Sequence, residues 1–325
     1  MTSMDIYVDN SLLRSVATCS TQALLRHRYG MSTPDEAAPL RAGRAFHRAM
    51  EVFFGTRGVD QRGALAVFET DYRAWADANV PDDHRLAWPN LNRIIASWMA
   101  TRMTTIPFDW PHPSLVEIGF AFPLVEGIVF VGRLDGLVNS ASLDAWYILE
   151  HKSTFRITSE WTTNLRNDSQ VSGYIWAATQ HLGKPVVGAF INGVEFSKLP
   201  VSTRKCPKHA VPYVECADAH VNSDLFSVQR TPNALDEWKW SAVNLARGFV
   251  ELSQRYPTID TVGGAPVEGK FSGACGRCQF REFCAFGKPQ SQVKAMLVYD
   301  PWNPLDHATA VRQPMPAKEE GSIHE

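Results

Sequence analysis

The residues best suited to chemistry in this sequence are two acids and a lysine near the middle of the chain. Asp135 lies within the apolar segment 128–138, and the next such segment, 146–152, ends with Glu150 and Lys152. Both segments are short, rich in β-branched and aromatic residues and bounded by turn residues, which predicts two neighbouring strands. Charges on otherwise apolar strands are costly to bury unless they are paired or bind a metal ion. The alternative is an ordinary Glu150–Lys152 ion pair on an exposed face.

The alternation of side chains along a strand indicates how these groups could meet. If a hairpin centred near 141–142 joins the two strands, Asp135 lies opposite Ile148 or its immediate neighbour. Its carboxylate then comes near that of Glu150, with the ammonium of Lys152 beside them. Carboxylate oxygens are preferred ligands of Mg2+ and Mn2+, and such an ion can activate water and neutralise charge on a phosphoryl group.

These residues resemble the signature of a known family. An Asp followed by Glu150-His-Lys152 at the end of a second strand resembles the motif of the PD-(D/E)XK nuclease superfamily. On a predicted helix, Gln170-Val-Ser-Gly-Tyr174 resembles the QxxxY element of its RecB-like branch, whose i and i+4 side chains share one helix face. The resemblance implies a restriction-endonuclease-like fold and metal-dependent hydrolysis of phosphodiester bonds.

A histidine further upstream fits the same branch. Gly43-Arg-Ala-Phe-His47 lies in a predicted helix and is similar to the branch's histidine motif. The resemblance implies that Asp135 and Glu150 are the central metal ligands and that His47 is an additional one. A lone helical histidine is otherwise most often structural, and Glu51, one turn further on, offers it a different partner.

The resemblance also implies roles for residues that do not bind the metal. Lys152 would orient or help to deprotonate the attacking water and offset charge in the transition state. Gln170 and Tyr174 would position Lys152, the water or the substrate backbone. Glu117, on the preceding predicted strand, either joins the acidic cluster or has a structural role, and the sequence leaves both open.

Four of the six cysteines form a pattern that suits a metal centre. Cys275, Cys278 and Cys284 have C-x2-C-x5-C spacing. A tetrahedral ion or an iron–sulfur cube needs a fourth ligand, and Cys19 is the best candidate. Spacing alone favours a structural Zn2+. One early and three late cysteines around a nuclease core, however, resemble the iron–sulfur nucleases related to AddB and to the CRISPR-adaptation exonucleases, which implies a 4Fe-4S cluster.

The two remaining cysteines lie in a polar insertion. Cys206, His209, Cys216 and His220 have a spacing compatible with a zinc site of the Cys2His2 type. The same stretch is also compatible with a plain insertion that carries free thiols. The sequence leaves these two interpretations open.

The rest of the chain is mainly helical in its pattern. Apolar residues recur at three-to-four spacing near 10–29, 40–56, 61–79 and 87–105, and a helix near 168–182, a strand near 185–196 and a helix near 234–256 follow the central strands. We therefore predict an α/β fold with a mixed β-sheet core flanked by helices. Its expected parts are a helical region with Cys19 and His47 (1–105), a nuclease core (106–260) with an insertion near 198–222, a cysteine segment (261–290), and a docked segment with a flexible tail (291–325).

Composition and charge restrict the class of protein. The 325 residues carry a formal charge of -2 and 45% hydrophobic residues, which excludes a disordered or collagen-like chain. Asp5 and Asp9 stand where a secretory leader needs positive charge, and no apolar stretch approaches the roughly 20 residues of a membrane span. We therefore expect a cytoplasmic protein without membrane contact, whose clustered cysteines bind metal rather than form disulfides.

The near-zero net charge is unevenly distributed along the chain. A local basic surface is sufficient for binding nucleic acid, although solvated helix faces have a similar composition. Two basic patches stand out, one in segment 11–50 and one in the insertion. Their members are Arg14, Arg26, Arg28, Arg41, Arg44 and Arg48 in the first, and Lys198, Arg204, Lys205 and Lys208 in the second.

The sequence thus predicts a DNA nuclease dependent on Mg2+ or Mn2+, acting as an exonuclease on single strands or duplex ends. It contains no helicase motif, so unwinding would require a helicase or recombination partner. The alternative is a non-catalytic DNA-binding or recombination accessory module with the same fold. The sequence leaves several properties open: the polarity of digestion, exonuclease against endonuclease cleavage, the preference for DNA or RNA, the oligomeric state and the pathway (phage, repair or CRISPR adaptation).

Overall fold

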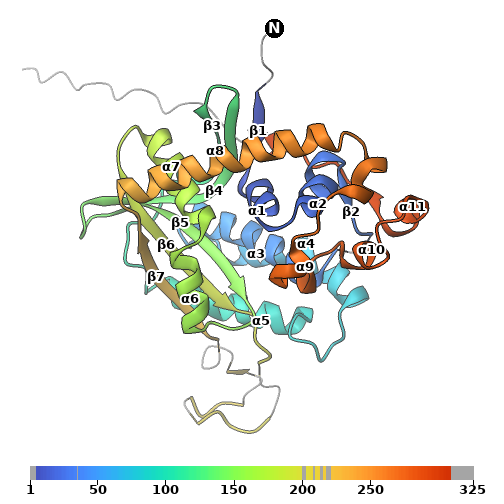
Figure 1. The fold of residues 1–325 in the computed structure, drawn as a ribbon. Coiled ribbons are helices and arrows are strands. Elements are labelled where there is room, and N and C mark those ends of the chain that lie inside the picture. The colour runs from blue at the N-terminus through green and yellow to red at the C-terminus, as the bar shows by residue number, and fades with distance from the viewer. Residues whose placement is uncertain are drawn as a thin grey trace, which may run out of the picture.

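The centre of the fold is a mixed β-sheet (Figure 1). The computed structural model describes residues 5–34, 36–199, 203–207, 209–212, 215–216 and 221–308. The strands of this sheet are β1 (Ile6–Val8), β3 (Val116–Val125), β4 (Ile128–Ser140), β5 (Ala145–Thr154), β6 (Val186–Glu195) and β7 (Ser223–Gln229). They run in the order β1-β4-β5-β6-β7, and β3 pairs with β4. β1 is parallel to β4 and β5 to β6, whereas the other pairs are antiparallel.

Two helices connect the parallel strands β5 and β6, because parallel neighbours require a crossover. They are α6 (Ser159–Arg166) and α7 (Ser169–Leu182). The side chain of Asp168 accepts the backbone N–H of Gln170 at 2.7 Å and so caps the first turn of α7. Gly183 ends the helix in the left-handed conformation, with φ of 63°. These caps fix the helix that carries Gln170 and Tyr174.

Helices cover both faces of the sheet. One face packs against α1 (Asn10–Thr18), α7 and α8 (Pro232–Arg255), and the other against α3 (Ala38–Gly55), α4 (Gln61–Asn79) and α5 (Trp88–Arg102). In the first core Phe130 packs on Trp238, with ring centroids 5.1 Å apart, and in the second Phe46 packs on Trp98 at 6.0 Å. The predicted α/β class, a mixed sheet flanked by helices, is confirmed.

A third, smaller core joins the two ends of the described chain. Leu24 and Leu25 pack with Phe280 and Phe283, and the short strands β2 (Met31–Ser32) and β8 (Val298–Tyr299) pair with each other. Figure 1 shows the C-terminal helices beside α1 and α2. The small elements of this region are α2 (Ser20–Ala23), η1 (Leu24–Arg28), α9 (Gly269–Ser272), α10 (Arg281–Ala285), α11 (Val293–Met296) and α12 (Leu305–Ala308).

The helix predicted over 10–29 is interrupted, and the interruption has a tertiary cause. Cys19 is extended, with φ of -165° and ψ of 120°. Glu268 accepts hydrogen bonds from both the backbone N–H (2.8 Å) and the hydroxyl (2.7 Å) of Ser20, the first residue of α2. A carboxylate from the far end of the chain therefore caps a second helix and stabilises the break, which no local pattern could reveal.

The remaining predicted elements agree with the structure to within a few residues. The sequence did not predict β1, β7, α6, β2 or β8. The four strands are short or polar and pair with strands from other parts of the chain, and α6 is a short polar helix. None of the described helices is both long and apolar enough to cross a membrane. The division into parts remains a prediction, and most of the expected flexible tail, from residue 309 on, lies outside the described residues.

Candidate active site

The register of β4 and β5 brings the two predicted metal ligands opposite each other. The antiparallel ladder between these strands runs up to the pair Gly136 and Leu149. One step further along the strands, Asp135 and Glu150 therefore occupy facing positions. Both side chains are buried, with 9% of Asp135 and 1% of Glu150 exposed.

The predicted partner of Asp135 was wrong. Ile148 pairs with Leu137 instead, because the turn between the strands lies further along the chain than expected and occupies 141–144. The sequence contains no feature that distinguishes these two turn positions. The shift brings Asp135 closer to Glu150 than the predicted register would.

Asp135 is held by two donors. Its Oδ2 accepts the backbone N–H of His151 at 2.7 Å, and its Oδ1 lies 3.1 Å from Nδ1 of His47 on α3. Burial alone would raise the pKa of Asp135, but the charge and hydrogen bond of His47 and the N–H of His151 outweigh it and hold the pKa well below its usual range. Burial in turn lowers the pKa of His47, but Asp135 outweighs burial and raises it. The carboxylate is thus kept ionised beside a histidine.

Glu150 shares one oxygen with two donors and leaves the other without a partner. Lys152 Nζ donates to Oε1 at 2.5 Å and Gln170 Nε2 donates to the same atom at 3.1 Å, while Lys152 also donates to Gln170 Oε1 at 2.9 Å. Oε2 is buried and has no hydrogen-bond partner among the described residues. Burial, opposed by Lys152 and reinforced by Asp135, raises the pKa of Glu150 to about 7. A buried oxygen of this kind is costly unless a cation or a donor meets it.

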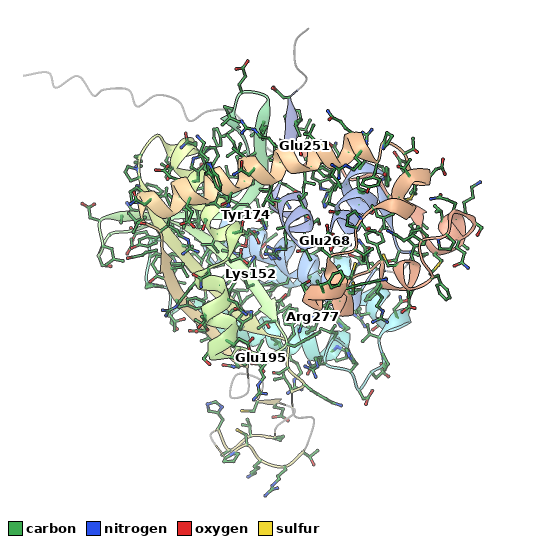
Figure 2. All side chains as sticks on the ribbon, in the orientation of Figure 1. Lys152, Tyr174, Glu195, Glu251, Glu268 and Arg277 are labelled. Carbon is green, nitrogen blue, oxygen red and sulfur yellow. The ribbon has the colours of Figure 1, made fainter. Side chains whose placement is uncertain are left out.

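Tyr174 completes the side of the site formed by α7. Its ring packs edge-on against Phe120 with centroids 5.8 Å apart. Gly132 on β4 makes this possible, because a Cβ there would lie 2.7 Å from Phe120 and 3.3 Å from the Tyr174 ring. Burial, followed by the charges of Glu150 and Asp135, raises the Tyr174 pKa well above its ordinary value, so the hydroxyl stays protonated. Figure 2 shows Lys152 and Tyr174 near the middle of the molecule.

Glu117 joins this cluster of acids. Ligand atoms of His47, Glu117 and Asp135 all lie within 4.8 Å of one another. Glu117 also forms an ion pair with Arg133, whose Nε lies 2.6 Å from Glu117 Oε2. The backbone of Glu117 has a positive φ of 53°, an unfavourable conformation for a glutamate. Burial and then Asp135 raise its pKa to about 8, against the opposing charge of Arg133. Sequence reasoning left its role open because positive φ has no signature in a strand pattern.

A buried polar chain supports the site from behind, and sequence reasoning missed it. The His151 ring stacks on Phe54 at 4.8 Å. Burial lowers the His151 pKa to about 3, so the ring is neutral and its Nδ1 accepts the Asn192 amide at 2.9 Å. Arg102 Nε donates to the Asn192 carbonyl oxygen at 3.2 Å. These contacts fix the backbone N–H that binds Asp135.

The site opens into a large groove with many arginines. Its volume of about 1340 Å³ exceeds the roughly 300–1,000 Å³ of small-molecule pockets. Arg26 of the predicted basic patch is not part of the lining and pairs with Asp300 at 3.1 Å. The lining includes Arg14, Arg41, Arg44, Arg48, Arg133 and Arg277.

The four cysteines of the expected metal centre, Cys19, Cys275, Cys278 and Cys284, line one small recess and are called the cysteine quartet below. Gly269 lies among them, since a Cβ there would be 3.2 Å from Cys275 Sγ. Burial, followed by the nearby charge of Cys278, raises the Cys284 pKa to about 11. Within the described residues, no three of these sulfur atoms lie within 4.8 Å of one another.

The second cysteine group is more compact. Ligand atoms of Cys206, His209 and Cys216 lie within 4.8 Å of one another. His220, the fourth residue of the predicted Cys2His2 pattern, lies outside the described residues, as does Lys208 of the second basic patch.

Comparison with known proteins identifies the class to which this fold and site belong. The family model for the PD-(D/E)XK nuclease superfamily matches residues 10–285. The chain therefore belongs to the PD-(D/E)XK nuclease superfamily, whose members use divalent metal ions. None of the curated proteins matches the sequence.

Proposed function

We propose that the protein is a DNA exonuclease that depends on Mg2+ or Mn2+ and hydrolyses phosphodiester bonds at DNA ends or in single strands. The observation that carries this proposal is the buried, unpartnered Oε2 of Glu150 beside ionised Asp135, next to a groove lined with arginines. Such an oxygen suits a site built for a cation.

The residues present fit a hard divalent cation. Asp135 and Glu150 supply carboxylate oxygens, and His47 and Glu117 add a nitrogen and a further carboxylate whose atoms lie close to those of Asp135. No cysteine is among them, so the donor set excludes a preference for soft metals. When bound, the cation would activate water and neutralise charge on the phosphoryl oxygens.

Lys152 is the residue proposed to act on the reacting atoms beside the ligands. Glu150 and Gln170 hold its ammonium in place at 2.5 and 2.9 Å, so its charge is fixed before substrate arrives. A preorganised cation stabilises the negative charge that develops on the phosphoryl group and can orient the attacking water. Gln170 bridges Lys152 and Glu150, and Tyr174, a protonated hydroxyl, is proposed to donate to substrate or water.

The groove supports a nucleic acid substrate. Arginines suit phosphate oxygens because their planar guanidinium can donate two hydrogen bonds at once. The most exposed of the ion-paired ones are Arg44 and Arg14, whose side chains are 66% and 60% accessible. Their carboxylate partners, Glu36 and Asp168, can be replaced by phosphate on binding. Action on ends follows from the RecB-like resemblance and is part of the proposal. A helicase or recombination partner is proposed only for any unwinding, because the sequence contains no helicase motif.

For the cysteine quartet we propose a 4Fe-4S cluster. All four cysteines line one recess, as four ligands of one metal centre must. The resemblance to the iron–sulfur nucleases favours the cluster over the structural Zn2+ alternative. The buried Lys288, whose Nζ donates to Thr21 Oγ1 and Ala265 O, places a positive charge near these thiolates. Colour and iron content of anaerobically purified protein test this assignment.

The test of the function uses anaerobically purified protein with end-labelled linear DNA and covalently closed circular single strands, in Mn2+. Exonuclease action predicts that linear DNA is degraded to short products from one labelled end while circles stay intact. Cleavage of the circles would replace the exonuclease with an endonuclease. Binding of DNA by iron-loaded protein without cleavage in Mn2+ or Mg2+ would favour the non-catalytic module.

A further inference from the structure

The insertion between β6 and β7 contains a group of side chains that the proposed function does not use. Nδ1 of His209 lies 3.0 Å from Sγ of Cys216, and both are within 4.8 Å of Cys206 Sγ. We call these three residues the loop site. Figure 1 shows the described parts of the insertion at the bottom of the view, below α5.

The backbone turns tightly around Cys206 and presents it to the other two residues. The N–H of Cys206 donates to Val211 O at 2.7 Å, and its carbonyl accepts the N–H of Ala210 at 2.9 Å. Lys205 and Pro212 form a bridge that closes the turn. Ala210 has a φ of 56°, an unfavourable value for a residue with a Cβ. Such a turn persists only if something holds it closed.

The burial pattern of the insertion indicates which residues stabilise the closed turn around Cys206. Cys206 and Cys216 are each 1% exposed. No other described residue between 203 and 216 is buried. Because the described part of the insertion offers no further buried side chain, a cross-link or a bound ion between the two buried cysteines would stabilise its fold. The two buried thiols and the exposed imidazole of His209 are the metal-binding groups that the described part of this loop brings together.

We propose that the loop site binds a zinc ion through Cys206, Cys216 and His209. Two thiolates and one imidazole are typical zinc ligands, and their mutual distances are compatible with one tetrahedral ion. Binding releases the two thiol protons to solvent and requires no oxidant. The site differs from the acidic cluster, whose oxygen ligands suit Mg2+ or Mn2+, and from the cysteine quartet, whose sulfurs are further apart.

A bound zinc ion would also fix the positions of two basic side chains at the end of the sheet where the active site lies. The insertion follows the end of β6, where Thr154 of β5 pairs with Glu195, two residues after Lys152. Arg204 and Lys205 directly precede Cys206 in the turn that the zinc ion would hold closed, and both are exposed. Binding of a DNA strand by these two side chains as it leaves the active site would rest on the proposed function. The proposal that the loop site binds zinc does not depend on that function.

The test is a metal analysis of full-length protein, with zinc and iron measured per chain in the wild type, Cys206→Ser and Cys216→Ser. Glu215→Gln, beside Cys216 and exposed, is the matched control. We expect each cysteine variant to lose about one zinc per chain with unchanged iron, and the control to lose none. His209→Ala changes an exposed side chain and should weaken zinc retention against a chelator without unfolding the protein.

A second readout distinguishes a bound zinc ion from a disulfide between the same two cysteines. Cobalt loaded at the loop site should give thiolate-to-metal absorption that is lost in Cys206→Ser and retained in Glu215→Gln. Equal zinc content in the wild type and both cysteine variants would overturn the proposal. A Cys206–Cys216 disulfide found by mass spectrometry of unreduced wild-type protein would also overturn it. Neither result depends on DNA cleavage.

Discussion

The acidic cluster and the cysteine quartet occupy the same protein but are built in opposite ways. Asp135 and Glu150 lie on adjacent strands, and their positions follow from the register of one hairpin. The quartet joins Cys19, near the start of the chain, to three cysteines near its end. The proposed catalytic residues thus lie on one sheet, whereas the proposed cluster would hold together segments that share only a small core. Damage to the two regions should therefore have different consequences.

The largest expected effect comes from breaking the quartet. Cys275→Ser should abolish the iron absorption and lower Tm by on the order of 10 °C, because several kcal/mol of metal-linked stability are lost and 1 kcal/mol shifts Tm by about 2–4 °C in a large domain. Iron analysis and thermal unfolding monitored by circular dichroism check this result. Cys216→Ser, in the insertion, is the control and should keep its iron. A Cys275→Ser protein with full iron and unchanged Tm would contradict the assignment.

The second effect is confined to chemistry. Lys152→Ala should lower the rate of DNA cleavage by about 10²–10³-fold, since it removes one preorganised charge from the site, and should leave the iron content unchanged. Lys184, which lies over the Trp146 ring at 4.3 Å and outside the groove, offers the control Lys184→Ala. Single-turnover cleavage of end-labelled DNA measures the difference. Equal rates for the two variants would remove Lys152 from the mechanism.

A smaller effect is expected where the two regions meet. Arg277 lies between two cysteines of the quartet, lines the groove and is labelled near the middle of Figure 2. Arg277→Ala should weaken DNA binding and reduce the slope of log K against log salt by about 0.7–0.9, the value of one phosphate contact. Arg281 is on the same segment, pairs with Glu282 and does not line the groove. Arg281→Ala should therefore leave the slope unchanged, and identical slopes for both variants would place DNA elsewhere.

The smallest effect concerns acid sensitivity near the joined chain ends. His27 packs edge-on against Trp302 at 4.6 Å, and burial, with a lesser contribution from Arg26, lowers its pKa from 6.5 to about 3. Because only the unfolded state takes up a proton between these values, the stabilisation is complete above pH 6.5 and is lost as pH falls. At pH 5 the loss relative to neutral pH amounts to about 2 kcal/mol. The free energy of unfolding in urea, measured at pH 5 and at pH 7.5, should differ less between the two pH values in His27→Gln than in the wild type. An equal difference in both proteins would contradict this role of His27.

Much of the fold and the centre of the site could be predicted because their signals are local. Short strands with alternating patterns contain Asp135, Glu150 and Lys152, and the i, i+4 spacing of Gln170 and Tyr174 places both on one face of α7. The spacing of Cys275, Cys278 and Cys284, together with the need for a fourth ligand, also indicated which four cysteines would line one recess. These inferences required only the chain itself and family motifs.

The features that sequence reasoning missed depend on contacts between distant segments. The break at Cys19 is stabilised by Glu268, and the support of His151 by Asn192 joins two strands. The register of the hairpin depends on which turn residues close it, and the positive φ of Glu117 is imposed by its surroundings. None of these leaves a periodic trace in the sequence.

The central claim is that the acidic cluster binds the divalent cation on which DNA cleavage depends. The most direct measurement is single-turnover cleavage of end-labelled single-stranded DNA by the wild type and Asp135→Asn, at matched iron content, in Mn2+ and in EDTA. We predict that EDTA stops the wild type, and that Asp135→Asn is slower by at least about a hundredfold with DNA affinity retained. Cleavage that survives EDTA, or a variant within tenfold of the wild type, would contradict the account.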